Sequence, residues 1–97
     1  MTVFHVTNGE PVVVPENEWG HFYSDDIYII DLKGAKHRYV VMWMGPKLNS
    51  EELSITTGYM DKVTNYENSS MITRNRVRKG HEDESLLSLF PNGFFIY

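Results

Sequence analysis

Cysteine is absent from all 97 residues of the sequence, and this absence removes several classes of protein at once. A disulfide scaffold, a thiolate zinc site and a cysteine nucleophile all need thiols, so each is excluded. A surplus of basic residues is also missing. The formal net charge is −4, whereas a dedicated nucleic-acid-binding protein needs a basic surface. The longest apolar runs, residues 27–32 and 39–44, are strand-sized and far shorter than the roughly 18 residues that span a membrane.

The sequence does contain enough apolar material for one compact domain. Hydrophobic residues make up 41% of the chain and aromatic residues 13%, a composition that argues against disorder. We therefore expect a single domain over residues 1–97. Residues 1–5 lack the basic start and the apolar stretch of a secretory signal, so we expect a cytoplasmic protein.

Two apolar segments predict the centre of a β-sheet. Residues 27–30 do not alternate with polar residues, which indicates a strand buried on both faces. Residues 39–44 form a second such run, and the turn at 33–36 predicts that the two strands pair as an antiparallel hairpin. Further extended segments are expected at 2–6, 12–14, 71–78 (more exposed) and 94–97, with a polar loop at 66–70.

A long helix is predicted after the second strand. Asn49 or Ser50 can cap its N-terminus, and Glu51 and Glu52 follow in the first turn, where the positive end of a helix favours carboxylates. A second, short helix is predicted from residue 82 onward, again with acidic residues at its start. The residues at helical spacing that should face the core from the long helix are Leu53, Thr56, Met60 and Val63. The element order predicts an α+β domain with a central mixed sheet.

Several of these segments resemble the signatures of one known family. Residues 22–32 resemble the first signature of a gelsolin/villin domain, and Trp43-Met44-Gly45 resembles the Trp-x-Gly that ends the next strand. Ser50-Glu51-Glu52 is similar to the acidic opening of that domain's long helix. Residues 76–82 and 85–90 resemble its Arg-x-x-x-Gly-x-Glu motif and its short helix. The resemblance covers essentially the whole chain, and a chain with one such domain also resembles the single-domain minimal gelsolins of Asgard archaea.

The resemblance implies a gelsolin-like α+β fold, in which a central five- to six-stranded mixed sheet lies between one long and one short helix. It also implies an actin-binding cytoskeletal protein rather than an enzyme. In this family, the long helix enters the cleft at the barbed end of an actin subunit, and calcium regulates many members. Since one domain offers one such helix, we expect monomer sequestering or barbed-end capping, with at most weak severing.

The resemblance also implies a calcium site. Asp26 matches the carboxylate ligand, Asp25 the position that supplies a backbone carbonyl, and Glu52 the bidentate helix glutamate. Oxygen ligands of this kind suit Ca²⁺. Asp25 stands where the family has glycine, so its backbone conformation is in question. The alternative interpretation makes Asp25 and Asp26 turn-capping residues and Glu52 a favourable charge in the first helical turn.

The surface expected to bind actin is the outer face of the long helix. In helix-in-groove recognition, a groove on the partner binds apolar anchor residues on an otherwise polar face of the helix. The residues assigned to it are Ser54, Ile55, Gly58, Tyr59, Lys62 and Asn65. The alternative is that Ile55 and Tyr59 belong to the core and that the helical phase is rotated by one position.

Two other groups of residues have weaker interpretations. The basic residues Arg74, Arg76, Arg78 and Lys79 alternate along one strand. In related domains such patches bind phosphoinositide headgroups, and the alternative is a solvated strand face that protects a sheet edge. The histidines, His5, His21, His37 and His81, have no metal-binding spacing. A gelsolin-fold scaffold or vesicle-coat interaction module without actin activity is the remaining alternative function.

Overall fold

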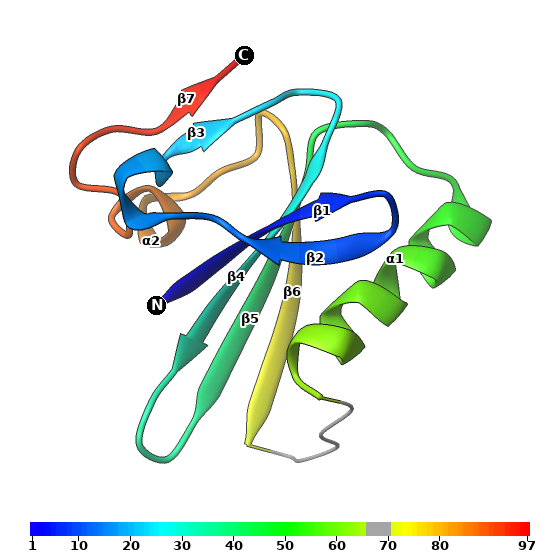
Figure 1. Ribbon diagram of the computed structural model, residues 1–97, viewed down its shortest axis with the longest axis horizontal. Helices are drawn as coiled ribbons and strands as arrows, with labels where there is room; N and C mark the ends of the chain where they lie inside the picture. Colours follow the sequence, from blue (N-terminus) through cyan, green and yellow to red (C-terminus); the bar gives the residue numbers. More distant parts are fainter. Residues whose placement is uncertain (66–70) are drawn as a thin grey trace.

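The computed structural model describes residues 1–65 and 71–97 and centres on a five-stranded sheet (Figure 1). Its strands are β1 (Thr2–Thr7), β2 (Glu10–Val13), β4 (Ile27–Lys33), β5 (Arg38–Met44) and β6 (Ile72–Arg78). The order across the sheet is β2-β1-β4-β5-β6. The sheet is mixed, because β6 runs parallel to β5 whereas the other neighbours are antiparallel. The polar loop predicted at 66–70 lies outside the described residues.

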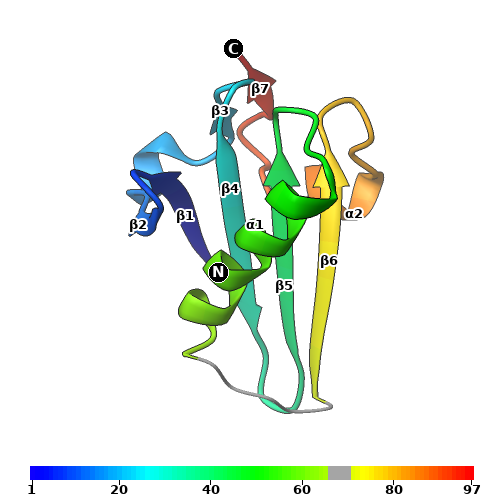
Figure 2. The ribbon, with the colours of Figure 1, turned by 90° about the vertical axis from the view of Figure 1, so that its right-hand side faces the viewer.

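Two helices cover opposite faces of this sheet (Figure 2). The long helix α1 (Ser50–Val63) lies across one face, and the short helix α2 (Glu84–Leu87) packs on the other. The 3-10 turn η1 (Glu16–Glu18) lies on the α2 side, as does a small parallel sheet of β3 (His21–Phe22) and β7 (Phe95–Ile96) (Figure 1). The predicted α+β class is confirmed, but the last strand pairs with β3 and not with the central sheet.

The central strands β4 and β5 are buried from both sides, as their unbroken apolar runs predict. Ile29 and Met42 belong to the core under α1. Ile30 and Trp43 belong to the core under α2. Trp43 is fully buried, and its indole N–H donates to Glu82 Oε1 at 2.8 Å. Burial alone would raise the pKa of Glu82, but hydrogen bonds from Trp43 and from backbone N–H groups hold it below the usual glutamate value.

A largely buried ion pair attaches the C-terminal end of α1 to the sheet. Arg38 donates through Nε to Asp31 Oδ1 at 2.9 Å and through Nη2 to Asp31 Oδ2 at 2.6 Å. The same Nη2 group donates to the carbonyl of Val63, in the last turn of α1, at 3.3 Å. A cation at this end of a helix is favourable, because the unpaired carbonyls there carry negative partial charge. The pair therefore links β4, β5 and α1 at one point.

Candidate functional site

Asn49 caps the N-terminus of the long helix and is one of the two caps predicted from the sequence. The Glu52 backbone N–H donates to Asn49 Oδ1 at 2.8 Å, and the Asn49 backbone N–H donates to Glu52 Oε1 at 3.2 Å. This reciprocal capping box satisfies two backbone donors that have no partner within the helix. It also engages the carboxylate of Glu52, which the sequence resemblance assigned to a calcium site.

The inner face of α1 is the predicted one. Thr56 and Met60 are buried, and Leu53 and Val63 are half-buried against the core under this helix. The hydroxyl of Thr56 donates to the Leu53 carbonyl at 2.9 Å, so this buried polar group is satisfied within the helix. The helical phase inferred from the sequence is therefore confirmed.

The outer face of α1 exposes most of the residues assigned to it. Ile55 is 58% exposed, and Ser54, Lys62 and Asn65 are exposed as well. A methyl group added at Gly58 would meet no atom within 4 Å, so open space lies over the middle of this face. The alternative interpretation that Ile55 is a core residue is wrong.

Tyr59 is the exception on this face. It is half-buried and packs against the core under α1, so its expected position away from the core is wrong. At about 100° per residue, Tyr59 lies roughly 40° around the helix from Ile55, toward Val63. That rotation places it at the boundary between the two faces, where it borders the exposed surface without being part of its centre.

Contacts with the sheet edges hold α1 on both flanks. On one flank Lys62 Nζ binds Glu10 Oε1 at 2.8 Å, which links the helix to β2. On the other flank Arg76 of β6 donates through Nη2 to the Thr57 hydroxyl. Sequence reasoning missed the roles of Glu10 and Thr57, because both contacts join elements far apart in the chain. A cavity of about 340 Å³ lies between the end of α1 and the start of the chain, lined by Phe4, Glu10, Pro11, Lys62 and Val63.

The structure does not gather the three expected calcium ligands into a metal site. The Asp26 carboxylate binds His5 Nε2 at 2.9 Å, and the Glu52 carboxylate accepts the Asn49 N–H. Within residues 1–65 and 71–97, three or more His, Asp or Glu side chains are nowhere grouped so that they could hold a metal ion. Asp25 has no positive φ, so the loss of the family's glycine causes no backbone strain there. The donors in this arrangement do not fit Ca²⁺, which takes six to eight oxygen ligands.

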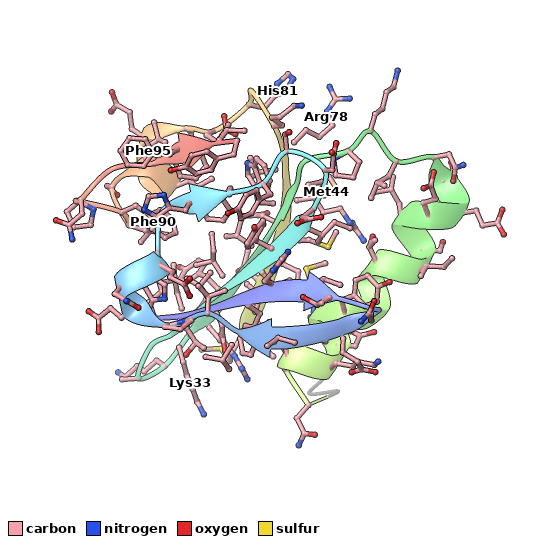
Figure 3. All side chains as sticks on the ribbon, turned by 45° about the horizontal axis from the view of Figure 1, so that its top comes forward. Lys33, Met44, Arg78, His81, Phe90 and Phe95 are labelled. Atoms are coloured by element: carbon pink, nitrogen blue, oxygen red, sulfur yellow. The ribbon has the colours of Figure 1, made fainter. Side chains whose placement is uncertain are left out.

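The basic residues of β6 lie along the edge of the central sheet, on the face that carries α1. Arg74 is half-buried, and Arg76 and Arg78 are exposed. Arg78 Nη2 lies 3.4 Å from His81 Nε2, and Figure 3 shows these two side chains at the end of the strand. The basic residues of β6 therefore form only partly a solvated surface, since Arg76 also contacts the long helix. In the described part of the chain, no helix combines the length and the apolar character that crossing a bilayer requires.

Comparison with known proteins yields relatives across nearly the whole chain. No protein-family model matches it. It is 28% identical to gelsolin-like protein 2 of Lumbricus terrestris, over 99% of this chain and 28% of that protein. It is 28% identical to gelsolin of Drosophila melanogaster, over 96% of this chain and 12% of that protein. It is 26% identical to villin-5 of Arabidopsis thaliana, over 91% of this chain and 10% of that protein.

The chain therefore spans between a tenth and just over a quarter of the length of these relatives. The relatives are animal and plant proteins, so the expectation of an archaeal origin stays a prediction. The matches, the mixed five-stranded sheet and the helices on its two faces agree with one another. Over nearly its whole length the chain is therefore similar to gelsolin and villin proteins, and its α+β fold is consistent with a gelsolin-homology domain.

Proposed function

We propose that this domain binds an actin subunit through the outer face of α1. The observation that carries the proposal is the exposure of Ile55, 58% of which is accessible at the centre of an otherwise polar face. An exposed aliphatic side chain on a helix is the anchor that helix-in-groove recognition uses. Next to it, the open space at Gly58 allows a partner surface to approach the helix backbone closely.

The helix is well prepared for such docking. Its 14 residues give a length of roughly 21 Å at about 1.5 Å per residue. The Asp31–Arg38 pair fixes its C-terminal end, and an exposed Lys62–Glu10 contact also joins it to β2. A helix that is already held in place loses little conformational entropy when it binds, and this favours affinity.

The expected consequence is control of actin assembly by occupancy of one cleft on one subunit. A domain that offers one such helix sequesters monomers or caps a barbed end, because either activity needs a single contact. Severing a filament requires a second contact along its side, so severing by this domain alone is weak at most. The proposal contains no calcium step, because Asp26 and Glu52 are bound to other groups in this arrangement.

The test is the substitution Ile55→Asp, assayed by pyrene-actin assembly and by sedimentation with monomeric actin. Placing a carboxylate at an apolar anchor should weaken binding by about 30-fold, the equivalent of a hot-spot loss of about 2 kcal/mol. The melting temperature should not change, because the side chain is 58% exposed.

Leu87→Asp is the matched control, since Leu87 is 40% exposed but lies on α2, across the sheet. This variant should bind actin like the unsubstituted protein. Equal binding by the Ile55→Asp variant and the unsubstituted protein would contradict the proposed face. No effect of excess unsubstituted protein on actin assembly would favour a scaffold without actin activity.

A further inference from the structure

Two neighbouring hollows form a groove that is lined by residues of η1, of β3, of the segment after α2 and of the chain end beyond β7. Figure 1 shows η1, β3, α2 and β7 together on the side of the sheet opposite α1. Two hollows make up this groove, with volumes of about 430 Å³ and 340 Å³. Asn17 and His21 line both hollows, so the two are adjacent. Hollows of several hundred Å³ are the usual size of ligand-binding sites. We call the two hollows together the aromatic groove.

Exposed aromatic side chains line the first hollow. Tyr23 and Tyr97 are each 56% exposed, and their ring centroids lie 5.5 Å apart at an interplanar angle of 36°. The ring of His21 stacks near Tyr97 at 5.7 Å, and its Nδ1 is hydrogen-bonded to the Tyr97 hydroxyl at 2.6 Å. These mutual contacts hold the rings in place, so the groove is formed before any partner binds.

The second hollow continues the aromatic surface. Its wall includes Trp19, whose indole N–H donates to the Val14 carbonyl at 3.2 Å, and Phe90 at the end of the α2 segment. Figure 3 shows Phe90 and Phe95 on neighbouring segments at this end of the molecule. Phe90 itself is only 5% exposed, so a partner that crosses both hollows would meet the exposed tyrosines of the first and then the half-buried Trp19 and Leu89 of the second.

The charge around the groove has one sign. Glu18 lines the first hollow and Glu16 the second. His5 also lines the first hollow, and its Nε2 lies 2.9 Å from Asp26 Oδ2, although Asp26 itself lines neither hollow. Among the described residues that line either hollow, no lysine or arginine occurs. A complementary partner therefore brings positive charge.

We propose that the aromatic groove binds a proline-rich segment of another protein that carries an arginine or lysine beside its prolines. Such a segment forms a polyproline II helix with three residues per turn, which docks onto aromatic-lined grooves at a low entropic cost. It has no internal hydrogen bonds, and the side chains of Asn17 and Tyr23 can donate to its carbonyl groups. The basic residue forms a charge-assisted hydrogen bond with Glu18.

This second binding surface is separate from the proposed actin-binding face. The central sheet lies between α1 and the aromatic groove, so one partner does not cover the surface used by the other (Figures 1 and 2). The groove can therefore be tested without actin, and the result bears on the groove alone.

The experiment is calorimetric titration of the whole chain with a synthetic polyproline peptide that has an amino-terminal arginine. Tyr23→Ala should weaken binding by about tenfold, since it removes an exposed aromatic surface. Tyr39→Ala is the matched control, because Tyr39 is also exposed, at 48%, but lines neither hollow, and its affinity should equal that of the unsubstituted protein. Ile55→Asp should bind the peptide unchanged.

The charge part of the proposal has its own variant and its own peptide. Replacement of the peptide arginine by glutamate should weaken binding, and Glu18→Gln should reduce the difference between the two peptides. Glu18 is exposed, so this variant tests the groove even if Tyr23→Ala fails to fold. Absence of binding at millimolar peptide, unchanged affinity of the Tyr23→Ala variant, or equal affinity for the two peptides would each overturn the proposal.

Discussion

The substitution Arg38→Met should destabilise the domain strongly, because it leaves a buried carboxylate without its partner. Asp31 is 8% exposed, and Arg38 supplies two hydrogen bonds to it. Breaking a buried ion pair by removal of one member costs about 3–5 kcal/mol, since the remaining charge stays desolvated. Methionine has a similar length to the arginine stem, so the change creates little empty space. It also removes the hydrogen bond from Arg38 to the Val63 carbonyl.

The size of this effect can be measured by urea unfolding. Trp43 is fully buried and Trp19 packs against the same core, so tryptophan fluorescence reports the loss of that core, and circular dichroism reports the loss of α1. For a domain of about 100 residues each kcal/mol corresponds to about 4–8 °C in melting temperature, so the melting temperature should fall by at least about 12 °C. The slope of unfolding free energy against urea should stay the same if only stability has changed.

Two further variants distinguish the effect of an unpaired buried charge from a general loss of contacts. Lys62→Met breaks the exposed pair with Glu10, whose side chains are 38% and 67% exposed, and should cost less than about 1 kcal/mol. The double variant Asp31→Leu with Arg38→Met removes both charges and should recover most of the stability lost in Arg38→Met. A cost below about 1 kcal/mol for Arg38→Met would refute the view that this pair is buried and essential.

Three other predictions concern the short-helix side, the expected calcium ligand and the outer face of α1. The pKa of Glu82 is lowered in the folded protein, so ionised Glu82 stabilises the fold at a pH above the usual glutamate pKa of about 4.3. This stabilisation is lost as the pH falls through the lower pKa of the folded state. The unfolding free energy of the unsubstituted protein should therefore fall more steeply than that of Glu82→Gln in acid unfolding series, and parallel curves would contradict this. Because Asp26 and Glu52 are hydrogen-bonded to other groups, CaCl₂ should raise the melting temperature no more than MgCl₂ does, and Glu52→Gln should act only through the weakened capping box. A calcium-specific rise in melting temperature that is smaller in Glu52→Gln would show that Glu52 is a calcium ligand. Gly58→Ala should raise the unfolding free energy by up to about 1 kcal/mol in thermal melts, because alanine favours helix and nothing lies within 4 Å of the added methyl group. A lower melting temperature of Gly58→Ala would contradict the open space over Gly58.

Local sequence patterns were sufficient for the parts of the fold that depend on near neighbours. The unbroken apolar run of β4 requires burial on both faces, and the Asn49 cap with Glu52 three residues later defines the start of α1. The last strand was different, because a two-residue strand carries almost no pairing information of its own. Its backbone bonds, such as Tyr97 N–H to the Phe22 carbonyl at 2.8 Å, join segments that are far apart in the sequence.

The contacts of the candidate calcium ligands depend on strand register, which the sequence does not specify. His5 and Asp26 are 21 positions apart, and they meet because the pairing of β1 with β4 sets His5 opposite Tyr28. The rings of His5 and Tyr28 then stack at 4.6 Å, which holds the imidazole beside the carboxylate. The sequence resemblance agrees with the gelsolin and villin relatives but could not show that the Asp26 carboxylate is hydrogen-bonded to His5.

The position of the sheet has a consequence for any coupling between the two proposed surfaces. Allosteric coupling needs an element with two arrangements that both partners bias to different extents. Here the surfaces are separated by β4 and β5, which are packed on both faces and joined to α1 through the Asp31–Arg38 pair. A packed layer of this kind resists small displacements. We therefore infer that a proline-rich partner would act by tethering, which raises the local concentration of the actin-binding face near that partner, and would leave the intrinsic affinity of α1 unchanged.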